Sequence, residues 1–122
     1  MKNESRQDHK KVDAMLLKKT EEFLTALQEG NADTLKDFVT EDFIMITPES
    51  GRNQGHEGLL PTQTDVLLEP KVTKLSNESV LITYEGMSHA FQLYRYVETA
   101  IWIKQGNSWK VASFQRTKIE KK

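Results

Sequence analysis

The C-terminal half of the sequence contains four segments with the composition of β-strands. Each is rich in β-branched and aromatic residues, and short groups of turn-forming residues separate them. Two of these breaks, Ser76–Glu78 and Gln105–Asn107, contain the Asn and Gly residues that tolerate the backbone of tight hairpins. Strands joined in this way form a meander, so we predict one curved antiparallel sheet from residues 66–75, 79–91, 94–104 and 108–117.

The N-terminal part has helical periodicity instead. Between Asp8 and Gln28 apolar residues recur at helical spacing, with lysines and glutamates between them, and Gly30 supplies a left-handed stop. Asn31 can cap a second, short helix. The apolar side chains of that helix share one face and are Leu35, Phe38 and Val39.

One short strand and one loop are predicted between the helices and the meander. Residues 42–50 are too short and too β-branched for a helix, and Pro48 ends the strand. Residues 51–58 have the composition of a loop, and Leu59–Pro61 suggests one brief turn of helix after it. The glycine spacing in the loop fits neither a dinucleotide fingerprint nor a P-loop, so a connecting loop is the better interpretation.

The order of the elements indicates the fold class. Helices first and strands afterwards are typical of an α+β domain, here a cone-shaped curved antiparallel sheet with the N-terminal helices packed in its concave face. The 122 residues suit a single domain with one core. We expect residues 1–8 to form a flexible head and residues 118–122 a flexible tail.

Composition excludes several classes of function. The chain has no cysteine, which rules out disulfides, thiolate zinc sites and thiol nucleophiles. A formal net charge of −1 gives no long-range attraction for nucleic acid or an anionic membrane. No segment is apolar enough to span a bilayer, and we expect a cytoplasmic protein. The three histidines are scattered, so neither a metal site nor a cofactor is predicted.

The last hairpin predicts which side chains face the interior. We expect Gln105–Asn107 to be a three-residue turn, which places Ile103 opposite Trp109 and Ile101 opposite Val111. The inward face is then apolar near the turn and polar toward its far end, like the floor of a pocket. Its candidate ligand contacts are Thr99, Ile101, Gln115 and Thr117.

The other face of the same hairpin is predicted to bind a second copy of the chain. It carries Trp102 and Phe114, with Glu98 and Arg116 as a cross-strand charged pair. Few monomers leave two large aromatic side chains on an open sheet, so we predict a homodimer with these four residues at the interface. A turn that differs by one residue would exchange the two faces.

Two stretches resemble the nuclear transport factor 2-like superfamily, in particular its bacterial SnoaL-like and ketosteroid-isomerase-like domains. The first is ETAIWIKQGNSWKVASFQRT, which contains the two tryptophans Trp102 and Trp109 around a turn. The second is LQEGNADTLKDFVTEDFIMITPESG, residues 27–51, which is similar to the family's helix-loop-helix-strand opening. The resemblance covers about residues 12–117 and implies a cone of sheet around a cavity, assembled as a dimer through the outer face.

The sequence departs from the family's pattern at three positions. Ala100 stands where members have a serine, Phe114 where they have a histidine, and Arg116 where they have a glycine. Ala100 and Phe114 cannot transfer a proton, so the resemblance carries over no catalytic residue.

Three classes of function remain. The first is a domain that binds a modest apolar molecule through the four contacts above and Tyr84, with His56 and Met45 as further candidates. The second is an isomerase- or cyclase-type enzyme with Tyr84 as hydrogen-bond donor and His56 or an unplaced acid as base. The third is an association module that works through its outer face.

Overall fold

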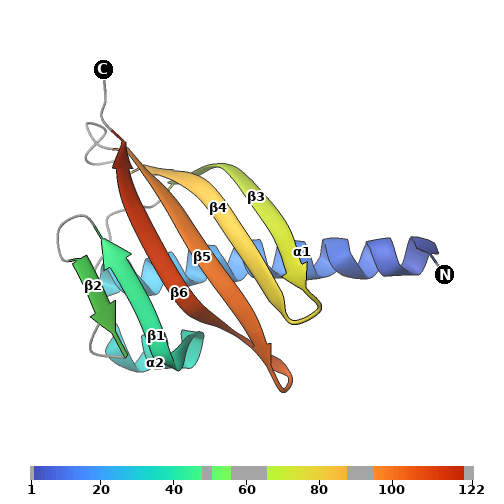
Figure 1. The fold of residues 1–122 in the computed structure, drawn as a ribbon, viewed down its shortest axis with the longest axis horizontal. Coiled ribbons are helices and arrows are strands. Elements are labelled where there is room, and N and C mark those ends of the chain that lie inside the picture. Colours follow the sequence, from blue (N-terminus) through green and yellow to red (C-terminus); the bar gives the residue numbers. More distant parts are fainter. Residues whose placement is uncertain (1, 48–50, 56–65, 88–94, 120–122) are drawn as a thin grey trace.

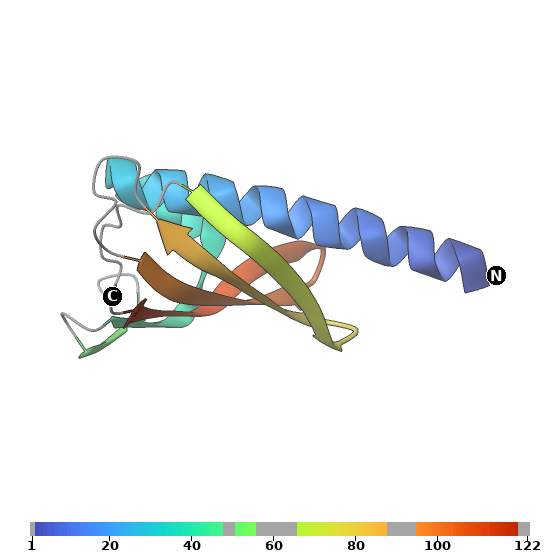
Figure 2. The same ribbon diagram turned by 90° about the horizontal axis from the view of Figure 1, so that it is seen from above.

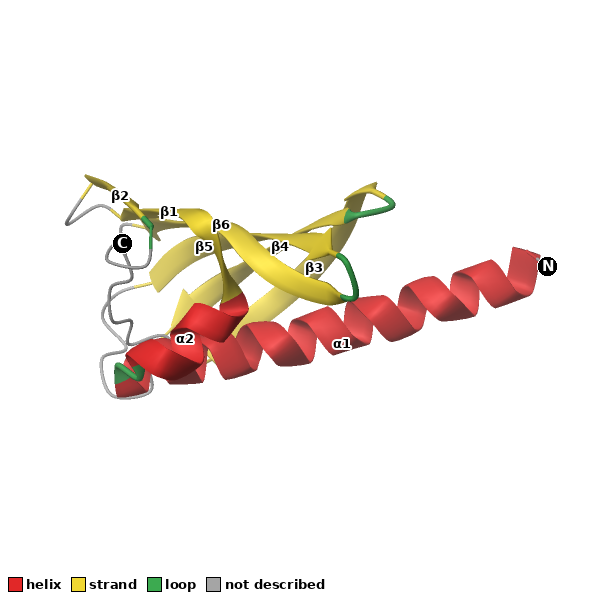
Figure 3. Cartoon of the chain, turned by 90° about the horizontal axis from the view of Figure 1, so that it is seen from below, coloured by secondary structure: helices red, strands yellow, loops and turns green. Residues whose placement is uncertain are grey.

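The structure is a computed structural model that describes residues 2–47, 51–55, 66–87 and 95–119. In these residues two helices precede a six-stranded sheet with the strand order β2-β1-β6-β5-β4-β3 (Figure 1). The α+β class predicted from the sequence is confirmed. Both helices lie on the same, concave side of the sheet (Figure 3).

Helix α1 (Lys2–Glu29) is longer than its apolar pattern predicts. It begins at Lys2, so residues 2–7 continue the helix through most of the segment expected to be a flexible head. Leu16, Phe23 and Leu27 recur at helical spacing and are buried against the sheet. The N-terminal part of α1 extends beyond the edge of the sheet (Figure 2).

The junction between α1 and α2 (Ala32–Phe38) follows the predicted signals. Gly30 has a φ of 68°, and its amide donates to the Ala26 carbonyl at 3.0 Å. The Asn31 side chain then accepts a hydrogen bond from the Thr34 amide at 3.2 Å, which caps α2. The chain passes directly from α2 into β1 (Val39–Thr47).

The four strands of the meander are β3 (Val66–Ser76), β4 (Ser79–Met87), β5 (Arg95–Gln105) and β6 (Ser108–Ile119). Each pairs antiparallel with its neighbour in sequence, as predicted. β1 pairs parallel with β6, so the sheet is mixed rather than wholly antiparallel. Because β6 ends at Ile119, the sheet also takes in the first residues of the predicted tail.

The segment predicted as a loop contains a strand. β2 (Gly51–Gln54) pairs antiparallel with the outer edge of β1, from Ile44–Gln54 to Thr47–Gly51. Its glycine and polar composition is typical of a loop, but the exposed edge of β1 supplies the backbone partners that make it a strand. The predicted helical turn at Leu59–Pro61 lies outside the described residues.

The turn of the β5–β6 hairpin is shorter than predicted. Gln105 pairs with Ser108, so Gly106 and Asn107 alone form the turn, and Gly106 has a φ of 62°. This register places Trp109 opposite Lys104 and Val111 opposite Trp102. Directly opposed side chains share a face, so both tryptophans lie on the concave face.

A bulge in β6 exchanges the inward and outward positions of the strand beyond it. Trp102 pairs with Val111, whereas Ile101 pairs with Ser113, so Ala112 is an extra residue in β6. Beyond the bulge the inward positions of β6 change from odd to even numbers. Phe114 is therefore buried, and Gln115 is exposed.

The two faces predicted for this hairpin are wrong over most of its length. Trp102, Phe114 and Glu98 are each 0% exposed, and Arg116 forms a buried ion pair with Glu98. They lie on the concave face, so they do not form an outward interface. The predicted pocket floor, Thr99, Ile101, Gln115 and Thr117, alternates with them and lies on the convex face.

The core fills the space between α1, α2 and the concave face. The Phe23 ring packs against Phe38, Phe43 and Phe114, with ring centroids 5.8–6.4 Å apart. Trp102 lies beside this cluster, and its indole N–H donates to the Thr20 hydroxyl of α1 at 3.0 Å. The largest aromatic side chains thus anchor α1 to the middle of the sheet.

Candidate functional site

Three polar side chains lie side by side on the concave face, across three neighbouring strands. Tyr84 of β4 is directly opposite Glu98 of β5, and Glu98 is directly opposite Arg116 of β6. We name Tyr84, Glu98 and Arg116 the polar row. One step along the strands the same face carries Ile82, Ala100 and Phe114, so the face changes from apolar to polar at this point.

Glu98 and Arg116 form a buried ion pair. The Arg116 Nε donates to the Glu98 Oε2 at 2.9 Å, and the side chains are 9% and 0% exposed, respectively. The cross-strand pair predicted from the sequence is confirmed, but it faces the core instead of solvent. A carboxylate in such a place is stable only with a charged partner and hydrogen bonds, because burial removes its hydration.

Tyr84 extends the pair into a three-residue cluster. Burial raises the pKa of its phenol well above the ordinary value of 10.0, and the nearby negative charge of Glu98 and the interaction with its side chain raise it further. The positive charge of Arg116 opposes this by lowering the pKa. Tyr84 therefore stays protonated near neutral pH and can donate a hydrogen bond.

Two donors of the polar row have no hydrogen bond of ordinary geometry to the described residues. They are the buried Tyr84 hydroxyl, which interacts with Glu98 without reaching that geometry, and the buried Arg116 Nη2. The guanidinium also lies over the Tyr96 ring, with Cζ 5.2 Å from the ring centroid. Stacking on this ring keeps the plane of the guanidinium fixed while its outer nitrogen is available to an acceptor.

The polar row offers two kinds of hydrogen-bond donor, a phenol and a guanidinium. The phenol donates in its neutral form and the guanidinium in its charged form, so neither has to lose a proton to do so. Beside them, Glu98 supplies the carboxylate that the sequence leaves unplaced. The row thus combines hydrogen-bond donors with an acid residue that can accept a proton.

The structure brings together only part of the site predicted from the sequence. Tyr84 lies on the concave face as predicted, and Met45 lies there also, opposite Phe114 and completely buried. Thr99, Ile101, Gln115 and Thr117 are on the other face. His56 is outside the described residues.

Within the polar row, the sequence prediction assigns Glu98 and Arg116 to the wrong face of the sheet. A signal for them exists in the alternation Glu98, Ala100, Trp102, in which a tryptophan and an alanine share a strand face. Assigning Trp102 to the core would have placed Glu98 inside with it. The three-residue turn predicted at Gln105–Asn107 assigns this face to the outside instead.

The described residues show neither a metal-binding cluster nor a membrane-spanning helix. They contain no group of three or more His, Cys, Asp or Glu side chains that could hold a metal ion. Over the same ranges, no helix combines the length and apolar character needed to cross a bilayer.

Solved structures with the same arrangement of helices and sheet were found by comparison. An NTF2-like protein from Cytophaga hutchinsonii superposes with a TM-score of 0.69 at 17% identity, over 88% of this chain and 98% of that chain. The chain has the NTF2-like fold. No protein-family model matches its sequence, and comparison with curated protein sequences finds no match.

Other NTF2-like structures with this similarity differ widely in function. The association domain of C. elegans CaMKII has a TM-score of 0.70 at 16% identity, over 88% of this chain and 96% of that one. Hexachlorocyclohexane dehydrochlorinase LinA-type3 from Novosphingobium barchaimii has a TM-score of 0.70 at 14% identity, over 92% and 89%. The NTF2-like fold therefore includes both enzymes and association domains, and function has to be argued from the site.

Proposed function

We propose that this NTF2-like domain binds a small molecule with an apolar body and an oxygen-bearing polar group. The oxygen is held by the Tyr84 hydroxyl and the Arg116 Nη2. The observation that carries the proposal is the buried polar row itself, which keeps two hydrogen-bond donors without ordinary partners among the described residues.

The energetic cost of the polar row supports a functional role. A buried ion pair stabilises a fold no better than well-packed apolar residues of similar volume, because each charge loses its hydration. Unsatisfied buried donors cost a further ~1–3 kcal/mol each. A ligand oxygen that accepts both hydrogen bonds would remove this cost, so ligand binding should stabilise the folded protein.

Catalysis is the second candidate, and the position of Glu98 favours it. In this role Glu98 removes a proton from a bound carbonyl compound while Tyr84 and Arg116 stabilise the negative charge that develops on its oxygen. The Arg116 Nε donates to the Glu98 Oε2, which holds the carboxylate in a fixed position in the row. Deuterium uptake from D2O into a bound ketone, followed by NMR and lost in Glu98→Gln, is the measurement that separates catalysis from binding.

A matched pair of variants tests the binding proposal. We expect a screen of aryl and alkyl ketones and carboxylic acids to raise the melting temperature of the wild-type protein. Tyr84→Phe removes one hydroxyl and keeps the ring, so it should weaken the best compound about fivefold or more, the value of one hydrogen bond. Thr99→Val, a change of similar size on the opposite face, is the control and should leave affinity unchanged.

The outcome is decided by the difference between the two variants. Native mass spectrometry of the purified protein shows in addition whether a molecule is carried through purification. If no compound stabilises the protein, or if Tyr84→Phe binds as tightly as Thr99→Val, the polar row is not a binding site.

Self-association is proposed through the convex face instead of the residues predicted from the sequence. There, Leu81, Ile101, Ser113 and Ile44 lie directly opposite one another across β4, β5, β6 and β1. All four side chains are partly exposed, and three of them are large and apolar. Such a row is typical of a surface that a second copy covers.

A further inference from the structure

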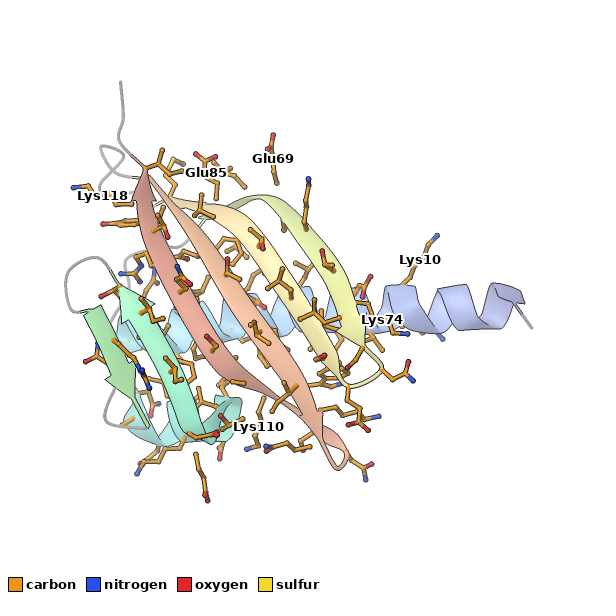
Figure 4. The ribbon with its side chains drawn as sticks, in the orientation of Figure 1. Lys10, Glu69, Lys74, Glu85, Lys110 and Lys118 are labelled. Atoms are coloured by element: carbon orange, nitrogen blue, oxygen red, sulfur yellow. The ribbon has the colours of Figure 1, made fainter. Side chains whose placement is uncertain are left out.

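A pocket of about 310 Å³ lies at the end of the concave face opposite the polar row. It is a partly open hollow between α1 and the two hairpin ends of the sheet. Figure 4 labels Lys74 at this end, beside α1, and Glu85 and Lys118 at the other end. We call it the hairpin pocket; its lining is Val12, Asp13, Val72, Lys74, Ser76, Asn77, Val80, Lys104 and Trp109.

The floor of the hairpin pocket is apolar and contains one aromatic side chain. Val80 is buried in the core, and Val72 and Trp109 are half-buried and pack against it. Val12 closes the floor from α1. The volume is at the lower end of the range for small-molecule sites, which suits a flat group of one or two rings.

Two lysines project from the sheet on the same side as this floor. Lys74 is directly opposite Val80, and Lys104 is directly opposite Trp109. Directly opposed residues of antiparallel strands place their side chains on one face, so both lysines stand at the rim of the pocket. Among the described residues of the lining, Asp13 of α1 is the one carboxylate, and it accompanies the two lysines.

We propose that the hairpin pocket binds a small organic anion with a flat apolar body, such as an aryl carboxylate. The ring system lies against Trp109 and the valines, and the carboxylate lies between the Lys74 and Lys104 ammonium groups. This site is separate from the polar row and does not depend on it. A neutral molecule of the same shape gains the apolar contacts only, and Asp13 disfavours further negative charge near α1.

The chain has two tryptophans, and this makes the test specific to the site. In the ¹⁵N-labelled protein the two indole N–H signals are assigned with Trp109→Phe. Naphthalene-2-carboxylate is then titrated, with naphthalene-2-carboxamide as its neutral counterpart. We expect the Trp109 signal to shift with the carboxylate while the signal of Trp102, which is buried and bonded to Thr20, stays in place.

Charge variants identify the anion-binding groups. Lys74→Glu and Lys104→Glu should each lower the affinity for the carboxylate about fivefold or more. Raising the salt concentration should lower the affinity of the wild type. Asp13→Asn should raise the affinity for the carboxylate, because it removes a negative charge from the lining. The control is Lys71→Glu, because Lys71 is exposed on the same strand but directly opposite Thr83, on the other face, and should change affinity less than about twofold.

Several results would overturn the proposal. If the carboxamide binds as tightly as the carboxylate, the pocket does not recognise the negative charge. If Lys74→Glu and Lys71→Glu lose the same affinity, Lys74 is not part of the binding site. If the Trp109 signal does not shift at millimolar concentrations of the carboxylate, the hairpin pocket is not its binding site. Tyr84→Phe should leave the Trp109 titration unchanged, so a failure here is distinct from a failure of the polar row.

Discussion

At the scale of single residues, the protonation state of Tyr84 is the property on which the polar row depends. Its pKa is raised in the folded protein, chiefly by burial, whereas the unfolded chain has the ordinary value of 10.0. Below pH 10.0 both states hold the proton, so the contribution of Tyr84 to stability is fully present there. Above it the unfolded state loses the proton first, and stability falls as pH rises.

This linkage predicts a difference between wild type and Tyr84→Phe that depends on pH. Between pH 7 and 9 the difference in their free energies of unfolding should be constant. From pH 10 upward the wild type should lose stability relative to the variant by up to about 1.4 kcal/mol per pH unit. Urea unfolding at a series of pH values measures both, and parallel curves up to pH 11 would show that the phenol is not shielded as described.

The sequence predicts some residues of the site correctly and misses others for a physical reason. Tyr84 is predicted to be a ligand contact inside the sheet, and the burial of β4 alternates without interruption from Val80 to Gly86 with Tyr84 on the buried side. Glu98 was placed outside because its face was derived from the turn, where an error of one residue is carried along the whole strand. The face of a side chain can thus be predicted where its strand alternates regularly. It cannot be predicted where it is derived from a distant turn.

At the scale of elements, helix caps and hairpin turns differ in how much the sequence reveals. The α1–α2 junction needs only Gly30 and Asn31, whose local conformations are strong signals. The β5–β6 hairpin depends on whether Gln105 belongs to the turn, and on the bulge at Ala112. Nothing in the composition of β6 marks that bulge, because it is set by packing of Val111 and Phe114 on one core.

The hydrogen bond between α1 and β5 gives a test at this scale. Thr20 accepts from the Trp102 indole at 3.0 Å and donates to the Leu16 carbonyl at 2.8 Å. Thr20→Val keeps the shape and leaves the buried indole N–H unsatisfied, which should cost about 1–3 kcal/mol of stability.

Thr25 provides the matched control for this variant. It makes the same intrahelical bond, to the Glu21 carbonyl at 3.0 Å, but it is exposed. Thr25→Val should change the free energy of unfolding by less than about 0.5 kcal/mol. Equal costs of the two variants, measured by urea unfolding, would mean that the hydrogen bond between Thr20 and Trp102 adds nothing to stability.

At the scale of the whole molecule, the order of the elements predicts the α+β class, whereas the position of β1 does not follow from it. The parallel pair of β1 and β6 joins the first and last strands of the described chain, and no local signal announces a contact over that separation. The pairing also changes the convex face of the sheet. Ile44 is brought into line with Ser113 and Ile101, which completes the apolar row on the convex face.

This row predicts how the molecule assembles. Ile101 is at its centre, directly opposite Leu81 on one side and Ser113 on the other. In a symmetric dimer formed through this face, Ile101→Glu places two carboxylates close to each other in an apolar contact. Like charges in an interface cost several kcal/mol, so the dissociation constant should rise at least about tenfold.

Size-exclusion chromatography with light scattering measures this change over a range of protein concentrations. Gln105→Glu is the control, because it adds the same charge to the same strand at the exposed hairpin turn, away from the row. We expect wild type and Gln105→Glu to migrate as two chains and Ile101→Glu as one folded chain. If Ile101→Glu still migrates as two chains, the convex row is not the contact, because an apolar interface cannot accommodate two facing carboxylates without a measurable loss of affinity.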